Sequence, residues 1–116
     1  MVPNFKPQIT LEDLKKIDIR VGRIQRVSDV PGSDKLMKLE VDFGRVERLV
    51  VAGIKKERAN PREIEGMQAL FVVNLPVRKM AGVTSEAMLF DIGYEDGIVP
   101  VLAVPEWPVP DGVRAG

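Results

Sequence analysis

The chain of 116 residues contains no cysteine and no histidine. Without cysteine, disulfide and thiolate chemistry are excluded. Without histidine, the commonest general base and the commonest metal ligand are missing, and a zinc site would have to be built from carboxylates alone. We therefore expect a protein that is not an enzyme and that holds neither a metal nor a cofactor.

Long apolar runs and aromatic residues are also scarce. No run of 18 apolar residues occurs, and residues 1–8 lack the apolar core of a signal peptide, so we expect a cytoplasmic protein without a membrane span. Aromatic residues make up 5% of the chain. That share is too small for base stacking to be the main source of affinity in nucleic-acid binding.

An excess of either charge is missing as well, because 17 Lys and Arg balance 17 Asp and Glu. This balance argues against a general nucleic-acid coat protein. The distribution is uneven, however, with a basic excess in residues 1–62 and an acidic excess in residues 63–116. One interpretation is a local basic face that attracts phosphate, and the other is chance unevenness in a small domain.

What is present is mostly the pattern of β-strands. Alternating or β-branched apolar residues predict strands over 17–27, 36–43, 47–54, 67–75, 87–92 and 98–104. Thr10 and Asn60 carry helix-start signals, which predict short helices over 11–16 and 61–65. Gly22, inside the first strand pattern, suggests a bulge or sharp bend.

Five strands with a one-turn helix between the third and the fourth predict an all-β protein, a five-stranded Greek-key barrel of the OB-fold type. An SH3-like barrel is the competing architecture, and the intervening helix disfavours it. Residues 1–9 are expected to form an N-terminal arm, and residues 10–116 one domain with a C-terminal extension. The extension either covers an open barrel edge or pairs with a second copy, and Trp107 within it is expected to close the barrel end or a dimer seam.

The most informative stretch of the chain is residues 74–88, between two strand patterns. It is longer than a simple hairpin turn, and it places an amide, paired positive charges and hydroxyls around Gly82. Groups of these kinds hold phosphates and single-stranded bases.

With these residues in view, the chain resembles the tRNA-binding domain family, an OB-fold module found free-standing and appended to methionyl- and tyrosyl-tRNA synthetases. The resemblance covers about residues 17–112. It implies tRNA as a partner, a homodimer, and a methionyl-tRNA synthetase as a further candidate partner. The blocks that carry it are Asp18–Gly22, Ser33–Leu36, Leu39–Gly44, Val50–Ile54, Asn74–Leu75 and Arg78–Met88.

Within this family, the chain looks like the free-standing form or the β subunit of methionyl-tRNA synthetase. The related CsaA chaperones, which bind peptides for protein export, share Asp18–Arg20 and part of the block around Gly82, so a chaperone is the alternative. Met88 and the Gly53–Ile54 ending favour the tRNA-binding members. Ala87 stands where many members have glycine.

The resemblance and the side-chain chemistry together give seven candidate contacts to tRNA. Cations would contact phosphates, polar groups a base edge or a 2′-hydroxyl, and the methionine a base. These residues are, in that order, Lys35, Lys38, Arg78 and Lys79, then Asn74 and Ser85, then Met88.

Each candidate also has a structural interpretation. The lysines and arginine can be solvated charges, Asn74 can tie its loop, Ser85 can cap local backbone, and Met88 can belong to the core. Asp18 and Arg20 are expected to pair with each other's strand neighbours and to serve structure. A hydrolytic group of Ser85, Glu86 and Lys79 ranks last, because neighbouring residues on a strand face opposite ways.

Overall fold

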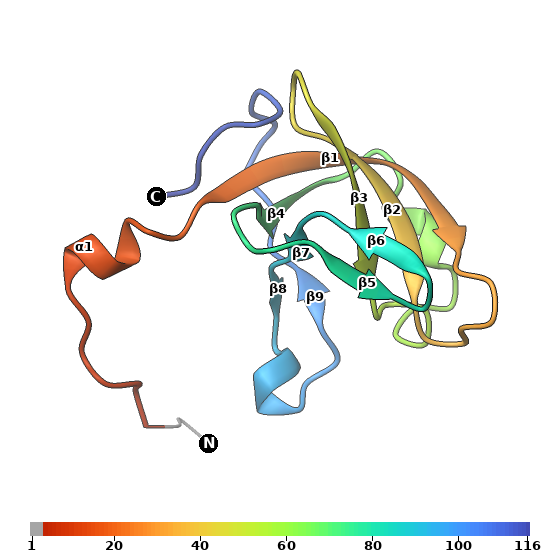
Figure 1. Cartoon of the computed structure of the whole chain (residues 1–116), viewed down its shortest axis with the longest axis horizontal. Coiled ribbons are helices and arrows are strands. Elements are labelled where there is room, and N and C mark those ends of the chain that lie inside the picture. Colours follow the sequence, from red (N-terminus) through yellow and green to blue (C-terminus); the bar gives the residue numbers. More distant parts are fainter. Residues whose placement is uncertain (1–3) are drawn as a thin grey trace.

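The computed structural model describes residues 4–116, so residues 1–3 of the predicted N-terminal arm lie outside the described part. Within the described residues, the main element is a curled, antiparallel five-stranded sheet with the strand order β3-β2-β1-β4-β7 (Figure 1). Two small two-stranded sheets, β5–β6 and β8–β9, accompany it. The elements are α1 (Leu11–Leu14), β1 (Ile19–Asp29), β2 (Met37–Asp42), β3 (Glu47–Ala52), η1 (Pro61–Ile64), β4 (Gln68–Val72), β5 (Arg78–Met80), β6 (Val83–Ser85), β7 (Met88–Leu89), β8 (Asp91–Ile92), η2 (Tyr94–Asp96) and β9 (Val101–Leu102).

This all-β, OB-like architecture confirms the predicted fold class. The 3₁₀ helix η1 lies between β3 and β4 as predicted, and the side chain of Asn60 caps it by accepting from the Arg62 N–H. Thr10 caps α1 and forms a capping box with Asp13. The helix ends two residues earlier than predicted. No helix in residues 4–116 combines the length and the apolar character needed to cross a bilayer.

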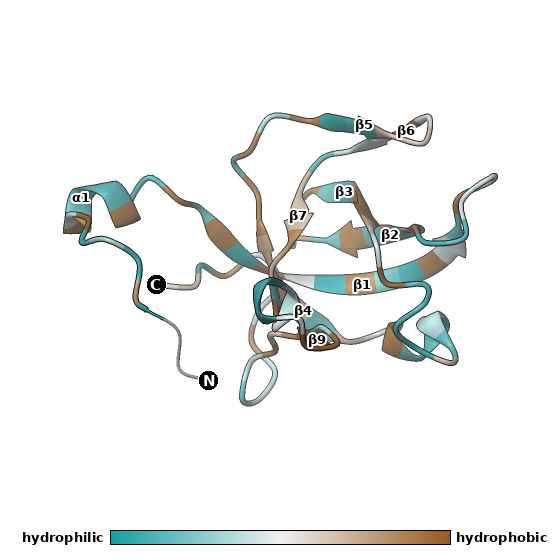
Figure 2. Cartoon of the chain, turned by 90° about the horizontal axis from the view of Figure 1, so that it is seen from below, coloured by the Kyte–Doolittle hydropathy of each residue, from teal (hydrophilic) through white to brown (hydrophobic). Residues whose placement is uncertain are grey.

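The core lies inside the curl of the large sheet. Strand alternation supplies it: Met37, Leu39 and Val41 of β2 are buried, as their spacing predicted. Phe71 of β4 is fully buried, and its ring meets the ring of Phe43 edge-on at 5.5 Å between centroids. Figure 2 shows the same alternation of polar and apolar residues along β1.

Strand β1 is the long element around which the sheet curls, because it pairs with β4 in its first half and with β2 in its second. The bulge predicted at Gly22 lies instead between Ile24 and Arg26, where the register with β2 shifts. Gly22 has a different role: a Cβ there would come within 2.5 Å of the Val41 side chain and 2.7 Å of the Phe43 ring. The glycine therefore allows β1 to lie close to the core side chains of β2.

Residues 78–85 form a β-hairpin, whereas the sequence interpretation took residues 74–88 as one long connection. Strands β5 and β6 pair with Met80 opposite Val83, which leaves a two-residue turn of Ala81 and Gly82. Both turn residues have positive φ, +50° and +81°, as a type I′ turn requires. Alanine at the first turn position hides the usual Asn-Gly signal, which is why the hairpin was missed. Figure 2 shows the hairpin at one edge of the molecule, over β3.

The last predicted strands are shorter than expected. The pattern over 87–92 divides at Phe90 into β7, which pairs with β4, and β8, which pairs with β9. Residues 112–115 then return along β1, where the Gly112 N–H donates to the Val21 carbonyl at 2.7 Å and the Ala115 N–H to the Ile19 carbonyl at 2.8 Å. The tail thus covers an edge of β1, one of its two predicted roles. Trp107 is 68% exposed and does not plug the barrel end.

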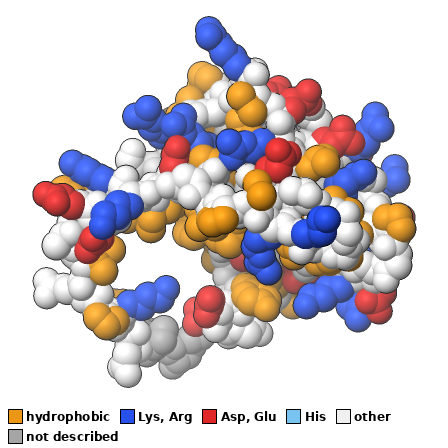
Figure 3. Space-filling model, in the orientation of Figure 1, with side chains coloured by type: hydrophobic (Ala, Val, Ile, Leu, Met, Phe, Trp, Pro, Cys, Tyr) orange, Lys and Arg blue, Asp and Glu red, His pale blue; other side chains and the backbone are white. Residues whose placement is uncertain are grey.

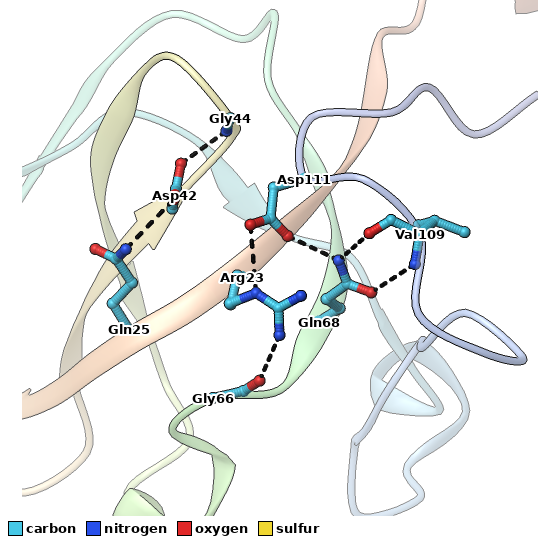
Figure 4. A network of polar contacts seen from close by, with 8 residues as sticks. All are labelled: Arg23, Gln25, Asp42, Gly44, Gly66, Gln68, Val109 and Asp111. Carbon is cyan, nitrogen blue, oxygen red and sulfur yellow. Dashed lines mark hydrogen bonds and ion pairs between the residues drawn. The ribbon is translucent and has the colours of Figure 1, made fainter.

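A group of polar contacts, called here the tail network, holds the C-terminal segment (Figure 4). The buried amide of Gln68 donates to the Val109 carbonyl at 2.6 Å and to Asp111 Oδ1 at 2.7 Å, and its oxygen accepts from the Val109 N–H at 3.2 Å. Arg23 Nε pairs with Asp111 Oδ2 at 3.3 Å. The tail network therefore consists of four residues, each hydrogen-bonded to at least one of the others: Arg23, Gln68, Val109 and Asp111.

Candidate nucleic-acid interface

The barrel closes between β3 and the end of the hairpin, at a seam formed by Ser85 and Glu86. The Val51 N–H donates to Ser85 Oγ and the Leu49 N–H donates to Glu86 Oε1, each at 2.9 Å. In return the Glu86 N–H donates to the Leu49 carbonyl at 2.8 Å. Side-chain oxygens thus accept hydrogen bonds from two backbone N–H groups of β3 that would otherwise pair with a neighbouring strand, so these two donors of the β3 edge are not left unpaired.

Beside the seam lies a cleft of about 700 Å³. Lys35, Arg78, Ser85 and Met88, four of the seven candidates, line it. Met88 is 43% exposed, so it belongs to the cleft surface rather than to the core. Lys35 and Arg78 form no ion pair within the described residues, and their charges remain available to an anion. In Figure 3, Lys and Arg side chains are spread among exposed apolar ones on one face of the molecule.

Ser85 lines the cleft, but its hydroxyl is already used within the protein. It is 6% exposed, accepts from Val51 and donates to the Ala87 carbonyl at 3.0 Å. These bonds agree with the structural interpretation of Ser85. Its contact to RNA stays a prediction that would have to use the remaining lone pair.

Three candidates do not line the cleft: Lys38, Asn74 and Lys79. Lys79 lies between Arg78 and Met80 on β5, and both of those neighbours line the cleft, so strand alternation directs Lys79 to the other face. Lys38 is half-buried on β2. Roles for these lysines in phosphate binding stay predictions.

Asn74 ties two chain segments together. Its Oδ1 accepts from the Asp18 N–H at 2.9 Å, and its Nδ2 donates to the Lys16 carbonyl at 2.6 Å. The amide thereby fixes the end of β4 against the residues that precede β1. This geometry agrees with the loop-tying interpretation, and a base contact by Asn74 stays a prediction.

Asp18 and Arg20 pair with each other, whereas each was expected to pair with the other's strand neighbours. Arg20 Nε donates to Asp18 Oδ1 at 2.7 Å, and Nη2 donates to Oδ2 at 3.3 Å. This hydrogen bonding, opposed by partial burial, lowers the pKa of Asp18 below its ordinary value. Arg20 Nη1 also donates to the Gly112 carbonyl at 3.2 Å, so the pair helps to hold the tail.

The acidic side of the cleft was not anticipated from the sequence. Four carboxylates line it together with the cations Lys6, Lys35 and Arg78: those of Glu95 and Asp96, and those of Glu57 and Asp91, whose pKa values burial raises above the ordinary value. Repulsion between Glu57 and Asp91 adds to the shift of Glu57. These two lie 34 positions apart, in segments with no shared motif, so only the fold brings them together. The cleft therefore presents cationic groups for phosphate and acceptors for donor groups.

Comparisons with known proteins place the sequence and the fold in one family. The family model described as "Putative tRNA binding domain" matches residues 19–114. The methionine–tRNA ligase of Porphyromonas gingivalis is 42% identical over 94 residues, which are 81% of this chain and 14% of that protein. The methionine–tRNA ligase of Nitrosomonas europaea is 40% identical over 106 residues, which are 91% of this chain and 15% of that protein.

Two solved structures match most of the fold. The MetRS related protein from Pyrococcus horikoshii has a TM-score of 0.87 and 35% identity, covering 96% of this chain and 100% of that one. The chaperone CsaA from Bacillus anthracis has a TM-score of 0.81 and 31% identity, covering 95% and 100%. Sequence and structure agree, and the chain belongs to the tRNA binding domain family.

Proposed function

We propose that the chain binds tRNA in the cleft beside the seam and acts by binding alone, without chemistry of its own. It would serve as a free-standing accessory or as the β subunit of a methionyl-tRNA synthetase, in the cytoplasm. The proposal rests on one observation: two cations that form no ion pair within residues 4–116, Lys35 and Arg78, line the cleft together with the half-exposed Met88.

Each of these groups matches a part of RNA. A cation that forms no ion pair can contact a phosphate without first losing a partner, and each such contact makes affinity fall with salt. Apolar groups beside it can pack against the face of an unstacked base. Because few aromatics are present, shape and phosphate spacing would dominate, and binding would discriminate poorly among tRNA sequences.

A homodimer is part of the proposal. The β8–β9 sheet and the tail expose a series of apolar side chains that a second copy would cover: Ile92, Ile98, Val99, Val101, Val104 and Trp107. Two linked clefts would raise affinity through effective concentration. Sedimentation at micromolar protein concentration would show a dimer, and a monomer at that concentration would remove this part of the proposal.

The test of the function is a gel shift with total tRNA across a salt series, comparing the unchanged protein with Arg78→Ala/Lys79→Ala. We expect micromolar or tighter binding at low salt and a loss of about twentyfold in the double variant, since one or two phosphate contacts disappear. Arg26→Ala/Arg62→Ala is the matched control. It removes the same charge at exposed sites outside the cleft, and it should bind within about twofold.

The alternative function is the binding of unfolded peptides, in line with the likeness to the chaperone CsaA. One feature favours it, namely the apolar part of the cleft lining, which includes Leu75, Phe90 and Tyr94. Apolar peptides that bind and that tRNA does not displace would support the chaperone. The absence of any shift with tRNA at low salt would remove the tRNA proposal.

A further inference from the structure

A second hollow lies at the other end of β3 from the cleft. Its volume is about 220 Å³, and it was not among the sites expected from the sequence. Its walls come from the start of β1, the turn between β2 and β3, the end of β4 and the tail. The lining residues are Asp18, Arg20, Phe43, Val46, Arg48, Val73 and Gly112.

Arg48 is the residue that makes this hollow chemically unusual. Its Nη1 donates to the Val73 carbonyl at 2.8 Å and to the Glu86 carbonyl at 3.2 Å, which fixes the guanidinium in place. No carboxylate within residues 4–116 pairs with it, and its Nε and Nη2 make no hydrogen bond there. A guanidinium stays charged at any physiological pH and presents its donors as a planar fork. One edge of a fixed fork is thus left for an external oxyanion.

The surroundings add positive charge to this site. Arg20 also lines the hollow, held by Asp18, so two guanidinium groups face one carboxylate. Arg114 of the tail is close enough to act on Asp18 as well, since its charge contributes to lowering the pKa of that carboxyl. The remaining walls, Phe43, Val46 and Val73, are apolar and compete for no hydrogen bond.

We infer that this hollow is a second phosphate subsite, in which Arg48 binds the RNA backbone beyond the cleft. The inference rests on the proposed function. Ala52 of the cleft lies four residues from Arg48 on the same face of β3, a separation of about 13 Å at about 3.3 Å per residue. An RNA strand bound in the cleft would cross the seam, with Arg78 and Lys35 on one side and Arg48 on the other.

Val46 provides a test that leaves the hydrogen bonds of Arg48 intact. It is 53% exposed at the hollow, so Val46→Glu adds a negative charge there while Val46→Gln adds the same bulk without charge. We expect Val46→Glu to weaken tRNA binding about fivefold through repulsion, and Val46→Gln to bind within about twofold of the unchanged protein. Ala59→Glu, exposed and outside both hollows, controls for net charge and should also bind within about twofold.

Cross-linking gives an independent measurement, because the chain has no cysteine of its own. A benzophenone maleimide attached at Val46→Cys should cross-link to bound tRNA, and the same label at Ala59→Cys should not. Circular dichroism of each variant checks the fold, and if Val46→Glu unfolds, the cross-link decides. Equal binding by Val46→Glu and Val46→Gln, with no cross-link at position 46, would overturn the second subsite but leave the proposed function standing. Failure of the unchanged protein to bind tRNA would remove both.

Discussion

The tail network and the cleft use the same kinds of side chain in opposite ways. In the tail network, the Gln68 amide and the Asp111 carboxylate find all their partners inside the protein, at 2.6–3.3 Å. In the cleft, Lys35 and Arg78 border an open space and pair with nothing in the described chain. Burial in the cleft raises the pKa values of Glu57 and Asp91, because it disfavours their charged forms.

This difference separates residues that stabilise the fold from residues to which we assign ligand binding. A satisfied polar network stabilises one structure, and its loss leaves buried groups without partners. Unpaired charges at a concave surface contribute little to folding and are available for recognition. Substitutions in the tail network should therefore change stability, whereas substitutions at the cleft cations should change affinity.

The largest effect is expected at Gly112, where the tail passes the β2–β3 turn. Its φ is +91°, and a Cβ would lie 2.1 Å from the Phe43 carbonyl oxygen, so Gly112→Ala requires the backbone to move. We expect a loss of about 3 kcal/mol or more in the free energy of unfolding, measured by urea denaturation. Gly66→Ala is the control, with φ of +89° but open space around it, and should cost about 1 kcal/mol. Equal costs would show that the tail is loosely held.

Ser85 does not fit the division between stabilising and ligand-binding residues, because it lines the cleft and also forms hydrogen bonds within the protein. Ser85→Ala leaves the Val51 N–H without its acceptor, which should lower the free energy of unfolding by about 1–3 kcal/mol. The folded variant should retain tRNA affinity within about twofold, while the exposed neighbour Thr84→Ala changes neither quantity. A marked loss of affinity without loss of stability would move Ser85 from the seam to the RNA contacts.

Single substitutions on β5 compare two neighbouring cations that face opposite sides of the strand. Arg78 lines the cleft and Lys79 does not, so Arg78→Ala should weaken tRNA binding about tenfold and Lys79→Ala about twofold. The salt dependence of binding should also become shallower in Arg78→Ala, by about one phosphate contact. Equal losses for the two variants would indicate that RNA contacts both faces of the hairpin.

The smallest effect is expected at Asp91, and it depends on pH. Burial raises the pKa of this carboxyl above its ordinary value of 3.8, so the folded state binds the proton more tightly than the unfolded state. The cost to stability is full above the folded pKa and disappears as the pH falls below the ordinary value. Asp91→Asn should therefore raise Tm by about 1–2 °C near pH 7, and by nothing near pH 3.5. A rise of the same size at both values would show that ionisation is not the cause.

The elements that the sequence predicted correctly are those set by local chemistry. The alternation over Met37–Val41 and the caps at Thr10 and Asn60 each depend on a few neighbouring residues, and each lies where it was expected. The bulge suggested at Gly22 was misplaced, because the glycine is required by the close approach of Val41 across the sheet, which no local pattern records.

The candidate site was less predictable, since its geometry depends on contacts between distant segments. The stretch 74–88 was located correctly, but Asn74 and Ser85 use their polar groups on partners 56 and 34 positions away. The carboxylates Glu57 and Asp91 and the guanidinium of Arg48 carried no motif at all. The raised pKa values of the two carboxyls follow from burial, and the open edge of the Arg48 guanidinium follows from the absence of a carboxylate partner within residues 4–116. Both become visible only in three dimensions.

The seam has a consequence for how large a ligand the protein admits. Within residues 4–116, Ser85 and Glu86 meet β3 through four hydrogen bonds, and one of these joins two main-chain groups. Separating the hairpin from β3 would cost about 1 kcal/mol for each bond, far less than peeling a full strand from the sheet. We therefore expect the cleft to widen more readily at the hairpin wall than at the opposite wall, which is built from the main sheet.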